Sequence, residues 1–253
     1  MARLISVHSF RGGTGKSNTT ANVATLLAAE GRQVGVVDLD IQSPGIHVIY
    51  GFDQDQLMRH SLNDYLWGDC ELREAAHDVT PEANGARLTG RVWLVPSSMR
   101  PADIARVMHE GYDVNRLNDG FRRLIEDLSL DVLLLDTHPG INEETLLSIA
   151  MSNALAIVLR PDQQDYQGTR VTVAVAQKLG VPRTVLVVNK APDVFDPAEL
   201  RAKVEETYGC PVAAVLPHSD DLMILSSEEV FSLRYPDHPL TGLYREVAAQ
   251  LAG

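Results

Sequence analysis

The sequence has few cysteines and no long apolar run, and each shortage excludes a class of protein. The only cysteines among its 253 residues are Cys70 and Cys210, which are far apart and lack C-x-x-C spacing. Neither a disulfide framework nor a thiolate metal site is therefore expected, and a reducing cytoplasm fits best. The apolar run before the first glycines is too short for a signal peptide, and no later window approaches about 18 apolar residues. We expect a soluble protein.

Basic residues are scarce relative to acidic ones. The chain has 22 lysines and arginines against 34 aspartates and glutamates, which gives a net charge of -12. This balance opposes non-specific attraction to the phosphate backbone of nucleic acid and to anionic lipid.

Short apolar runs alternate with helical patterns along the chain. Strands are expected where an apolar run of a few residues stops at glycine or polar residues, and helices where apolar residues recur at helical spacing. The predicted strands are 4–9, 33–37, 92–95, 131–135, 154–159, 184–188 and 212–216. The predicted helices begin at 16 and 101 and span 62–67, 72–79, 115–128, 166–179, 197–208, 220–227 and 240–251, whereas 81–90 is predicted to be a polar loop.

This alternation with short connections is typical of a parallel sheet covered by helices. It predicts an α/β fold, a doubly wound and mostly parallel sheet of about seven or eight strands with helices on both faces. No linker rich in Pro, Gly or Ser marks a second unit, so residues 1–253 are expected to form one domain.

A glycine-rich loop separates the first predicted strand from the first predicted helix. Residues 10–22 read FRGGTGKSNTTAN. Glycines let backbone N–H groups converge on phosphate oxygens, and the N-terminus of the following helix favours an anion. The predicted phosphate contacts are Gly12, Gly13, Thr14, Gly15, Lys16, Ser17 and Asn18. The general pattern G-x-x-x-x-G-K-[ST] needs a glycine where Phe10 stands, so this loop is a variant.

Aspartates follow two of the predicted strands. Asp38 and Asp40 come after 33–37, and Asp136 comes after 131–135. Hard carboxylates near a phosphate loop suit Mg²⁺, with the Ser17 hydroxyl as a ligand and Asp38 and Asp136 as outer-shell partners. The alternative for each aspartate is a helix N-cap or a turn.

The loop RGGTGKS resembles the deviant Walker A box, K-G-G-x-G-K-[ST], of the MinD/ParA family of P-loop ATPases. The resemblance continues in VVDLD at 36–40 (first switch), LLLDTHPG at 133–140 (Walker B and second switch), VVNK at 187–190 (base-binding segment) and LPHSDDLM at 216–223 (adenine loop). It implies a P-loop NTPase fold and a Mg-dependent ATPase. Such proteins act as dimerising switches that position or partition a cellular cargo.

The resemblance also implies roles for single residues. Asp40 is similar to the residue that positions or activates the attacking water, and the N–H of Gly140 is expected to meet the γ-phosphate. Asn189 is expected to bind the base edge, with Pro217 against one face; a strand-end asparagine in a turn is the alternative. A guanine site would want N-K-x-D, but Pro192 occupies the aspartate position, so adenine is favoured.

Arg11 is the main departure from the family pattern, because relatives carry a signature lysine there that reaches the partner's nucleotide across a dimer. Arginine keeps the charge but presents a rigid fork of five donors. Our hypothesis is that Arg11 contacts phosphate in trans and joins Lys16 and Asp40 as a catalytic residue. The alternative is a solvated arginine near the loop, which would weaken the case for an ATP-dependent homodimer.

The remaining motifs have alternative interpretations. Residues 160–169 either face the dimer or a partner or form a capped helix start, and His138 is assigned no catalytic role. The stripe of Leu240, Leu243, Val247 and Leu251 is expected to pack in the core, so membrane binding is not expected. Five arginines could form a patch resembling the DNA-binding surface of ParA-type members, which the net charge disfavours: Arg100, Arg106, Arg116, Arg122 and Arg123.

The expected partners are a second copy of the chain, bound in the presence of ATP, and an unidentified protein partner or activator. Two other functions stay open: an ATP-gated scaffold that hydrolyses poorly, and a phosphotransferase or ligase on the same fold. Metal-cluster carriers and reductases of this kind are disfavoured, because the paired cysteines that they use are missing.

Overall fold

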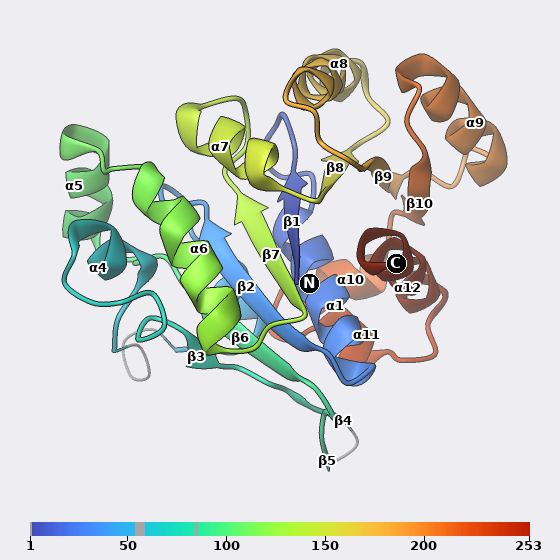
Figure 1. Cartoon of the computed structure of the whole chain (residues 1–253). Helices are drawn as coiled ribbons and strands as arrows, with labels where there is room; N and C mark the ends of the chain where they lie inside the picture. Colours follow the sequence, from blue (N-terminus) through green and yellow to red (C-terminus); the bar gives the residue numbers. More distant parts are fainter. Residues whose placement is uncertain (1, 54–58, 84–85) are drawn as a thin grey trace.

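The protein is built on one eight-stranded sheet (Figure 1). The structure is a computed structural model that describes residues 2–53, 59–83 and 86–253. The strand order is β10-β9-β8-β1-β7-β2-β6-β3, in which every neighbouring pair is parallel except β3 and β6. The strands are β1 Arg3–His8, β2 Gln33–Leu39, β3 His77–Asp78, β6 Arg91–Val95, β7 Val132–Thr137, β8 Ala154–Leu159, β9 Thr184–Ala191 and β10 Val212–Pro217.

Helices cover both faces of this sheet (Figure 1). They are α1 Lys16–Ala29, α2 Ile46–Ile49, α4 Leu62–Trp67, α5 Pro101–Glu110, α6 Asn115–Asp127, α7 Glu143–Met151, α8 Gln163–Lys178, α9 Pro197–Tyr208, α10 Asp220–Ile224, α11 Phe231–Arg234 and α12 Pro239–Ala252. The predicted α/β architecture is confirmed.

Strand β7 shows how the two faces are filled. Its side chains alternate, so Val132 and Leu134 pack in the cluster that holds α1, α11 and α12, whereas Leu133 and Leu135 pack with α4 and α6. All six residues of β7 are buried. A parallel strand buried on both sides has a continuous apolar run, and this is why the sequence pattern located it.

The segment 72–79 was wrongly predicted as a helix. It contains turns and the short strand β3, whose His77 and Asp78 pair antiparallel with Leu94 and Trp93 of β6. Leu72, Ala75 and Ala76 are buried, and their spacing imitates a helical face. The polar loop predicted at 81–90 also contains two short strands, β4 Glu82–Ala83 and β5 Ala86–Arg87.

Helix α7 was not predicted, although its ends carry recognisable signals. The side chain of Asn142 accepts a hydrogen bond from the N–H of Thr145, and Glu143 and Glu144 occupy the first turn. The four-residue helices α2 and α11 were also missed. Helices this short lack a repeated apolar period.

The C-terminal helix belongs to the core. Leu240, Val247 and Leu251 of α12 are at most 1% exposed, and Leu243 packs against the same cluster, as predicted. Among the described helices, none has both the length and the apolar content needed to cross a membrane.

Gly90, the residue before β6, lies against the end of α1, where its N–H donates to the Ala28 carbonyl oxygen at 2.9 Å. A Cβ added there would lie 2.1 Å from the Arg32 carbonyl oxygen and 2.6 Å from that of Ala28. Since backbone atoms must move to make room, Gly90→Ala is expected to lower the free energy of unfolding by about 1–3 kcal/mol, measured by urea denaturation.

The matched control is Gly242→Ala in α12, where no described heavy atom lies within 4 Å of an added Cβ. Alanine favours helix by up to about 1 kcal/mol, so this variant should be as stable as the wild type or more so. Equal stability of the two variants would contradict the assigned backbone contact.

Candidate functional site

A pocket of about 470 Å³ opens at the carboxyl edge of the sheet. It gathers the loops that follow β1, β2, β7, β9 and β10, because the ends of parallel strands meet at one edge. Its lining includes the predicted residues Gly12, Gly13, Gly15, Lys16, Ser17, Asn18, Asp40, Asn189 and Pro217. Several further lining residues had no predicted ligand contact of their own: Ser43, His138, Pro139, Lys190, Ser226 and Ser227.

The glycine loop leads into α1 with its anion-binding groups available. Gly13 and Gly15 have φ values of 74° and 97°, a region that side chains disfavour, and α1 begins at Lys16. Helix α1 has no side-chain N-cap and no acidic residue in its first turn among the described residues. Lys16 is only 6% exposed. The positive end of the helix dipole and a buried ammonium thus point to an anionic ligand.

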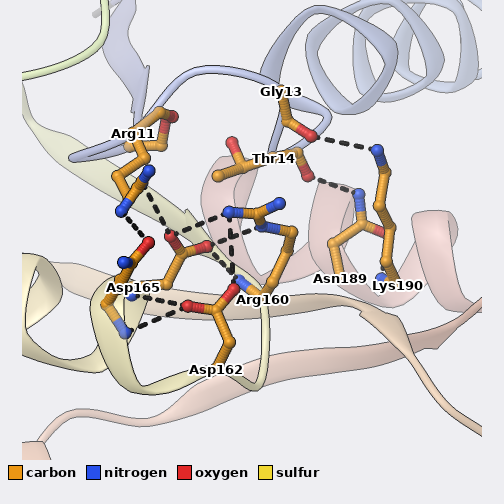
Figure 2. A network of polar contacts seen from close by, with 10 residues as sticks. Arg11, Gly13, Thr14, Arg160, Asp162, Asp165, Asn189 and Lys190 are labelled. Carbon is orange, nitrogen blue, oxygen red and sulfur yellow. Dashed lines mark hydrogen bonds and ion pairs between the residues drawn. The ribbon is translucent and has the colours of Figure 1, made fainter.

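Strand β9 holds the glycine loop in place (Figure 2). Asn189 donates from Nδ2 to the Thr14 carbonyl oxygen at 2.8 Å, and Lys190 donates from Nζ to the Gly13 carbonyl oxygen at 3.0 Å. In a trans peptide the N–H points opposite to the C=O, so the N–H groups of Thr14 and Gly15 face away from these two side chains. They are oriented for an anion on the other side.

Glycine is required at position 15 for a second reason. A Cβ there would lie 2.3 Å from Nδ2 of Asn189. The Asn189 amide also accepts a hydrogen bond from the N–H of Lys190 at 2.8 Å and is 3% exposed. Asn189 therefore joins the glycine loop to the part of the pocket lined by Pro217.

Asp38 and Asp136, each predicted to follow a strand, lie side by side. They are register partners on β2 and β7, and both are at most 1% exposed. Asp38 accepts hydrogen bonds from the N–H groups of Asp40 at 3.0 Å and Gly45 at 3.2 Å. Thr20 donates to Asp136 at 3.3 Å, and Ser17 also bonds to it.

Burial disfavours the charged form of both carboxyls. It raises the pKa of Asp136 to about 6, although the nearby Lys16 ammonium opposes this shift. It also raises the pKa of Asp38 well above the ordinary range, and repulsion from Asp136 adds to that shift. A bound cation would relieve this cost. Ser17, Asp38 and Asp136 are the oxygen donors that could hold or orient a hard cation such as Mg²⁺.

No group of three or more His, Cys, Asp or Glu residues suited to a metal is found within the described ranges. At phosphate sites Mg²⁺ commonly takes only one or two protein carboxylates, together with waters and phosphate oxygens.

Asp40 and His138 meet across the pocket from different loops. Nδ1 of His138 lies 2.6 Å from Oδ1 of Asp40, and the two side chains are 24% and 17% exposed. The sequence analysis assigned His138 no catalytic role. Its position two residues after Asp136 was the available signal.

The N–H of Gly140 and the hydroxyl of Thr14, two predicted site residues, differ in whether they are engaged within the protein. The N–H of Gly140 donates to the Ser9 carbonyl oxygen at 3.1 Å, so in this conformation it is not free for a phosphate. The loop that contains Gly140 must release Ser9 before that N–H can meet a ligand. Thr14, by contrast, has a buried Oγ1 without a hydrogen-bond partner in the described part of the chain.

His8 lies behind the glycine loop at the end of β1, fully buried. Its Nδ1 is 2.7 Å from Oγ1 of Thr137. Burial, with the charges of Lys16 and His138 acting in the same direction, lowers the pKa of His8 to about 3. His8 is therefore neutral at physiological pH and adds no charge beside Lys16.

Arg11 extends toward α8 rather than into the pocket (Figure 2). Its guanidinium donates to Oε1 of Gln164 and lies 3.9 Å from Oδ1 of Asp165. Asp165 is also held by Arg160 at 3.0 Å, while Asp162 caps α8 through the N–H groups of Gln164 and Asp165. The capped helix start predicted at 160–169 is therefore present.

Phe10 fixes the same loop against α8. A Cβ added to Gly168 would lie 2.2–2.6 Å from atoms of the Phe10 side chain, so the side chain packs directly on the backbone of α8. Arg11 itself is 43% exposed and stands beside the mouth of the pocket, where a second molecule can approach it.

The buried carboxylate pair predicts a pH-dependent gain in stability for Asp136→Asn. The folded pKa of Asp136 is raised to about 6 against 3.8 when unfolded, so its stabilising contribution is complete below 3.8 and is lost as the pH rises through about 6. In metal-free and nucleotide-free buffer, Asp136→Asn should be about 1–3 kcal/mol more stable than the wild type at pH 8, and the gain should fall to about a third of that value at pH 4.5.

Urea denaturation at both pH values measures this difference. Asp119→Asn, an exposed aspartate on α6, is the matched control and should show no pH-dependent gain. An Asp136→Asn variant that is less stable than the wild type at pH 8 would contradict the electrostatic account.

Comparisons with known proteins agree with this geometry. The chain is 28% identical over 255 residues to an uncharacterized ATP-binding protein of Methanocaldococcus jannaschii, covering 100% of this chain and 89% of that protein. It is 30% identical over 191 residues to an iron-sulfur cluster carrier protein of Methanococcus maripaludis, covering 73% of this chain and 59% of the carrier.

Among solved structures, the septum site-determining protein MinD from Pyrococcus horikoshii, complexed with Mg-ADP, has the same fold. The TM-score is 0.80 at 21% identity, covering 98% of this chain and 95% of that one. A model of the ParA family, described as NUBPL iron-transfer P-loop NTPase, matches residues 1–252, and the chain therefore belongs to this family of P-loop NTPases.

Proposed function

We propose that this protein hydrolyses ATP to ADP and phosphate in the presence of Mg²⁺, and that ATP joins two copies into a dimer that positions or partitions a cellular cargo. The observation that carries the proposal is the uncapped N-terminus of α1, with buried Lys16, beside the carboxylates Asp38 and Asp136. One group favours a polyanion and the other a cation, and a metal–nucleotide complex supplies both.

Each part of the nucleotide has a proposed set of contacts. The N–H groups of residues 12–18 and the Lys16 ammonium bind the phosphates, and Ser17, Asp38 and Asp136 hold or orient Mg²⁺, which neutralises phosphate charge when bound. Asn189 and Pro217 line the same pocket and are proposed to contact adenine. The binding of Mg-ADP by MinD of Pyrococcus horikoshii supports this assignment.

Asp40 is proposed to orient the attacking water. Its side chain lines the pocket together with Lys16, and its N–H is held by Asp38. The γ-phosphoryl group is transferred to water, and the Lys16 ammonium stabilises the charge on its oxygens during the transfer.

Asp40→Ala separates an ATPase from an ATP-gated scaffold. Without the orienting carboxylate, the rate of phosphate release should fall by about 100-fold or more, while Mg-ATP affinity measured by calorimetry changes little. If the wild type binds Mg-ATP but releases phosphate no faster than Asp40→Ala, the protein is an ATP-gated scaffold and not an ATPase.

Arg11 is proposed to act on the partner's nucleotide in the dimer. It stands outside the pocket of its own chain, held by Gln164 and Asp165, and would exchange these contacts for phosphate oxygens of the second copy. ATP binding thereby favours the closed pair over separate copies.

Arg11→Ala is expected to bind Mg-ATP with near wild-type affinity but to remain monomeric. Sizing by light scattering with a slowly hydrolysed ATP analogue, and with ADP, measures the change in mass. Arg183→Ala, a change at an exposed residue before β9, is the matched control and should dimerise as the wild type does. Unchanged ATP-dependent dimerisation of Arg11→Ala would show that the arginine makes no contact in trans.

A second candidate is iron-sulfur cluster carriage, which the family description and the relative in Methanococcus maripaludis favour. The cysteines argue against it. Cys210 precedes β10 and Cys70 follows α4, and the two pack against different hydrophobic clusters (the two elements are seen in Figure 1). Anaerobic incubation with iron and sulfide should therefore give no cluster absorbance at a stoichiometry of one per chain.

The proposed partners are a second copy and a protein activator rather than DNA. The arginines that would form a basic patch largely have acidic or aromatic neighbours: Arg100 with Asp103, Arg106 with Glu110 and Trp67, Arg116 with Tyr65, and Arg123 with Glu71. Such pairing weakens the local positive field that binding to DNA requires.

A further inference from the structure

The bond between His138 and Asp40 links the two loops that reach the phosphate end of the pocket. Asp40 follows β2 and His138 follows β7, and the contact of 2.6 Å between Nδ1 and Oδ1 joins them directly. Both residues line the pocket together with Lys16 and Ser17. The contact is therefore made inside the site.

The chemistry of the pair fixes which atom donates. A carboxylate offers only acceptor lone pairs, so Nδ1 of His138 carries the proton and donates it to Asp40. A hydrogen bond to an ionised acceptor is shorter and stronger than one between neutral groups, and a donor–acceptor distance of 2.6 Å agrees with this.

Asp40 is held at both its backbone and its side chain. Its N–H donates to Oδ1 of Asp38 at 3.0 Å, and its carboxylate accepts from His138. With one carboxylate oxygen engaged by His138, the other oxygen keeps a defined direction. A group that must orient a water gains from such restriction, because an error of about 1 Å can cost about 100-fold in rate.

A purely structural role for His138 is the competing interpretation. The side chain is 24% exposed at the pocket wall and stands outside the three hydrophobic clusters formed by the described residues. Removing it therefore opens little core volume, and its loss should be felt at Asp40 rather than in the stability of the fold.

We propose that His138 is a positioning residue for ATP hydrolysis, which holds the carboxylate of Asp40 in the orientation that directs the attacking water. This inference rests on the proposed ATPase function. According to this inference, the loop after β7 takes part in hydrolysis through the His138 side chain. A movement of that loop would then also move the carboxylate of Asp40.

The test compares two substitutions at position 138. His138→Ala removes the donor and is expected to lower kcat for phosphate release by about 10- to 100-fold, with KM for ATP within about threefold of the wild type. His138→Asn is expected to recover most of this loss. Nδ2 of asparagine and Nδ1 of histidine are both bonded to Cγ, so asparagine can place a donor near the same point.

Three controls separate positioning from other effects. In an Asp40→Ala background, His138→Ala should cause no further loss, because the two residues act through one contact. His109→Ala, a change at an exposed histidine in α5, should leave kcat unchanged. The melting temperature of His138→Ala should stay within about 2 °C of the wild type.

A measurement without nucleotide tests the bond itself. In protein labelled with ¹⁵N-histidine, the His138 ring should show a proton on Nδ1 at low field, assigned by its absence in His138→Asn. Asp40→Ala should move or abolish this signal, and Asp119→Asn should not.

The outcomes distinguish the inference from the function on which it rests. A wild type that binds Mg-ATP but releases no phosphate overturns both. A wild type that hydrolyses ATP overturns the inference alone if His138→Ala has the wild-type kcat, if His138→Asn is as impaired as His138→Ala, or if the Nδ1 proton does not respond to Asp40→Ala.

Discussion

The site is arranged around two buried carboxylates that lie next to each other on adjacent strands. Asp38 and Asp136 face each other in register at the ends of β2 and β7. Their mutual repulsion and their burial both oppose ionisation. The surrounding groups reduce that cost: Lys16 from the helix start, the hydroxyls of Ser17 and Thr20, and the backbone N–H groups of Asp40 and Gly45. A fold that only needed stability would place apolar residues here.

The glycine loop is held from two sides by elements distant in sequence. On one side Asn189 and Lys190 bind its carbonyl oxygens, and on the other Phe10 and Arg11 contact α8. The loop therefore depends on tertiary contacts as well as on its own glycines. A loop fixed in this way does not have to be ordered by the ligand, which reduces the entropic cost of binding.

The architecture and much of the site could be predicted from the sequence, for identifiable physical reasons. Interior parallel strands such as β7 are continuously apolar, and polar residues at their ends must meet at one sheet edge. Because Asp38 and Asp136 both follow such strands, they could be expected at the same edge of the sheet. The prediction of a helix at 72–79 failed. The buried residues Leu72, Ala75 and Ala76 have the spacing of a helical face, although the segment is irregular.

Contacts between separate loops could not be predicted from the sequence pattern. That His138 reaches Asp40, that Arg11 lies against Gln164, and that the N–H of Gly140 is taken by Ser9 all depend on how separate loops fold toward one another. Local spacing carries no information on these distances. The sequence identified which residues end the strands, but not the directions of their side chains.

The packing of Phe10 on Gly168 has a consequence for how this chain can vary. A glycine within a helix costs about 1 kcal/mol relative to alanine, so α8 is weakened at this point. Any side chain at 168 would occupy the space of the Phe10 ring. A residue larger than glycine at 168 therefore requires the Phe10 side chain to move or to be replaced by a smaller one.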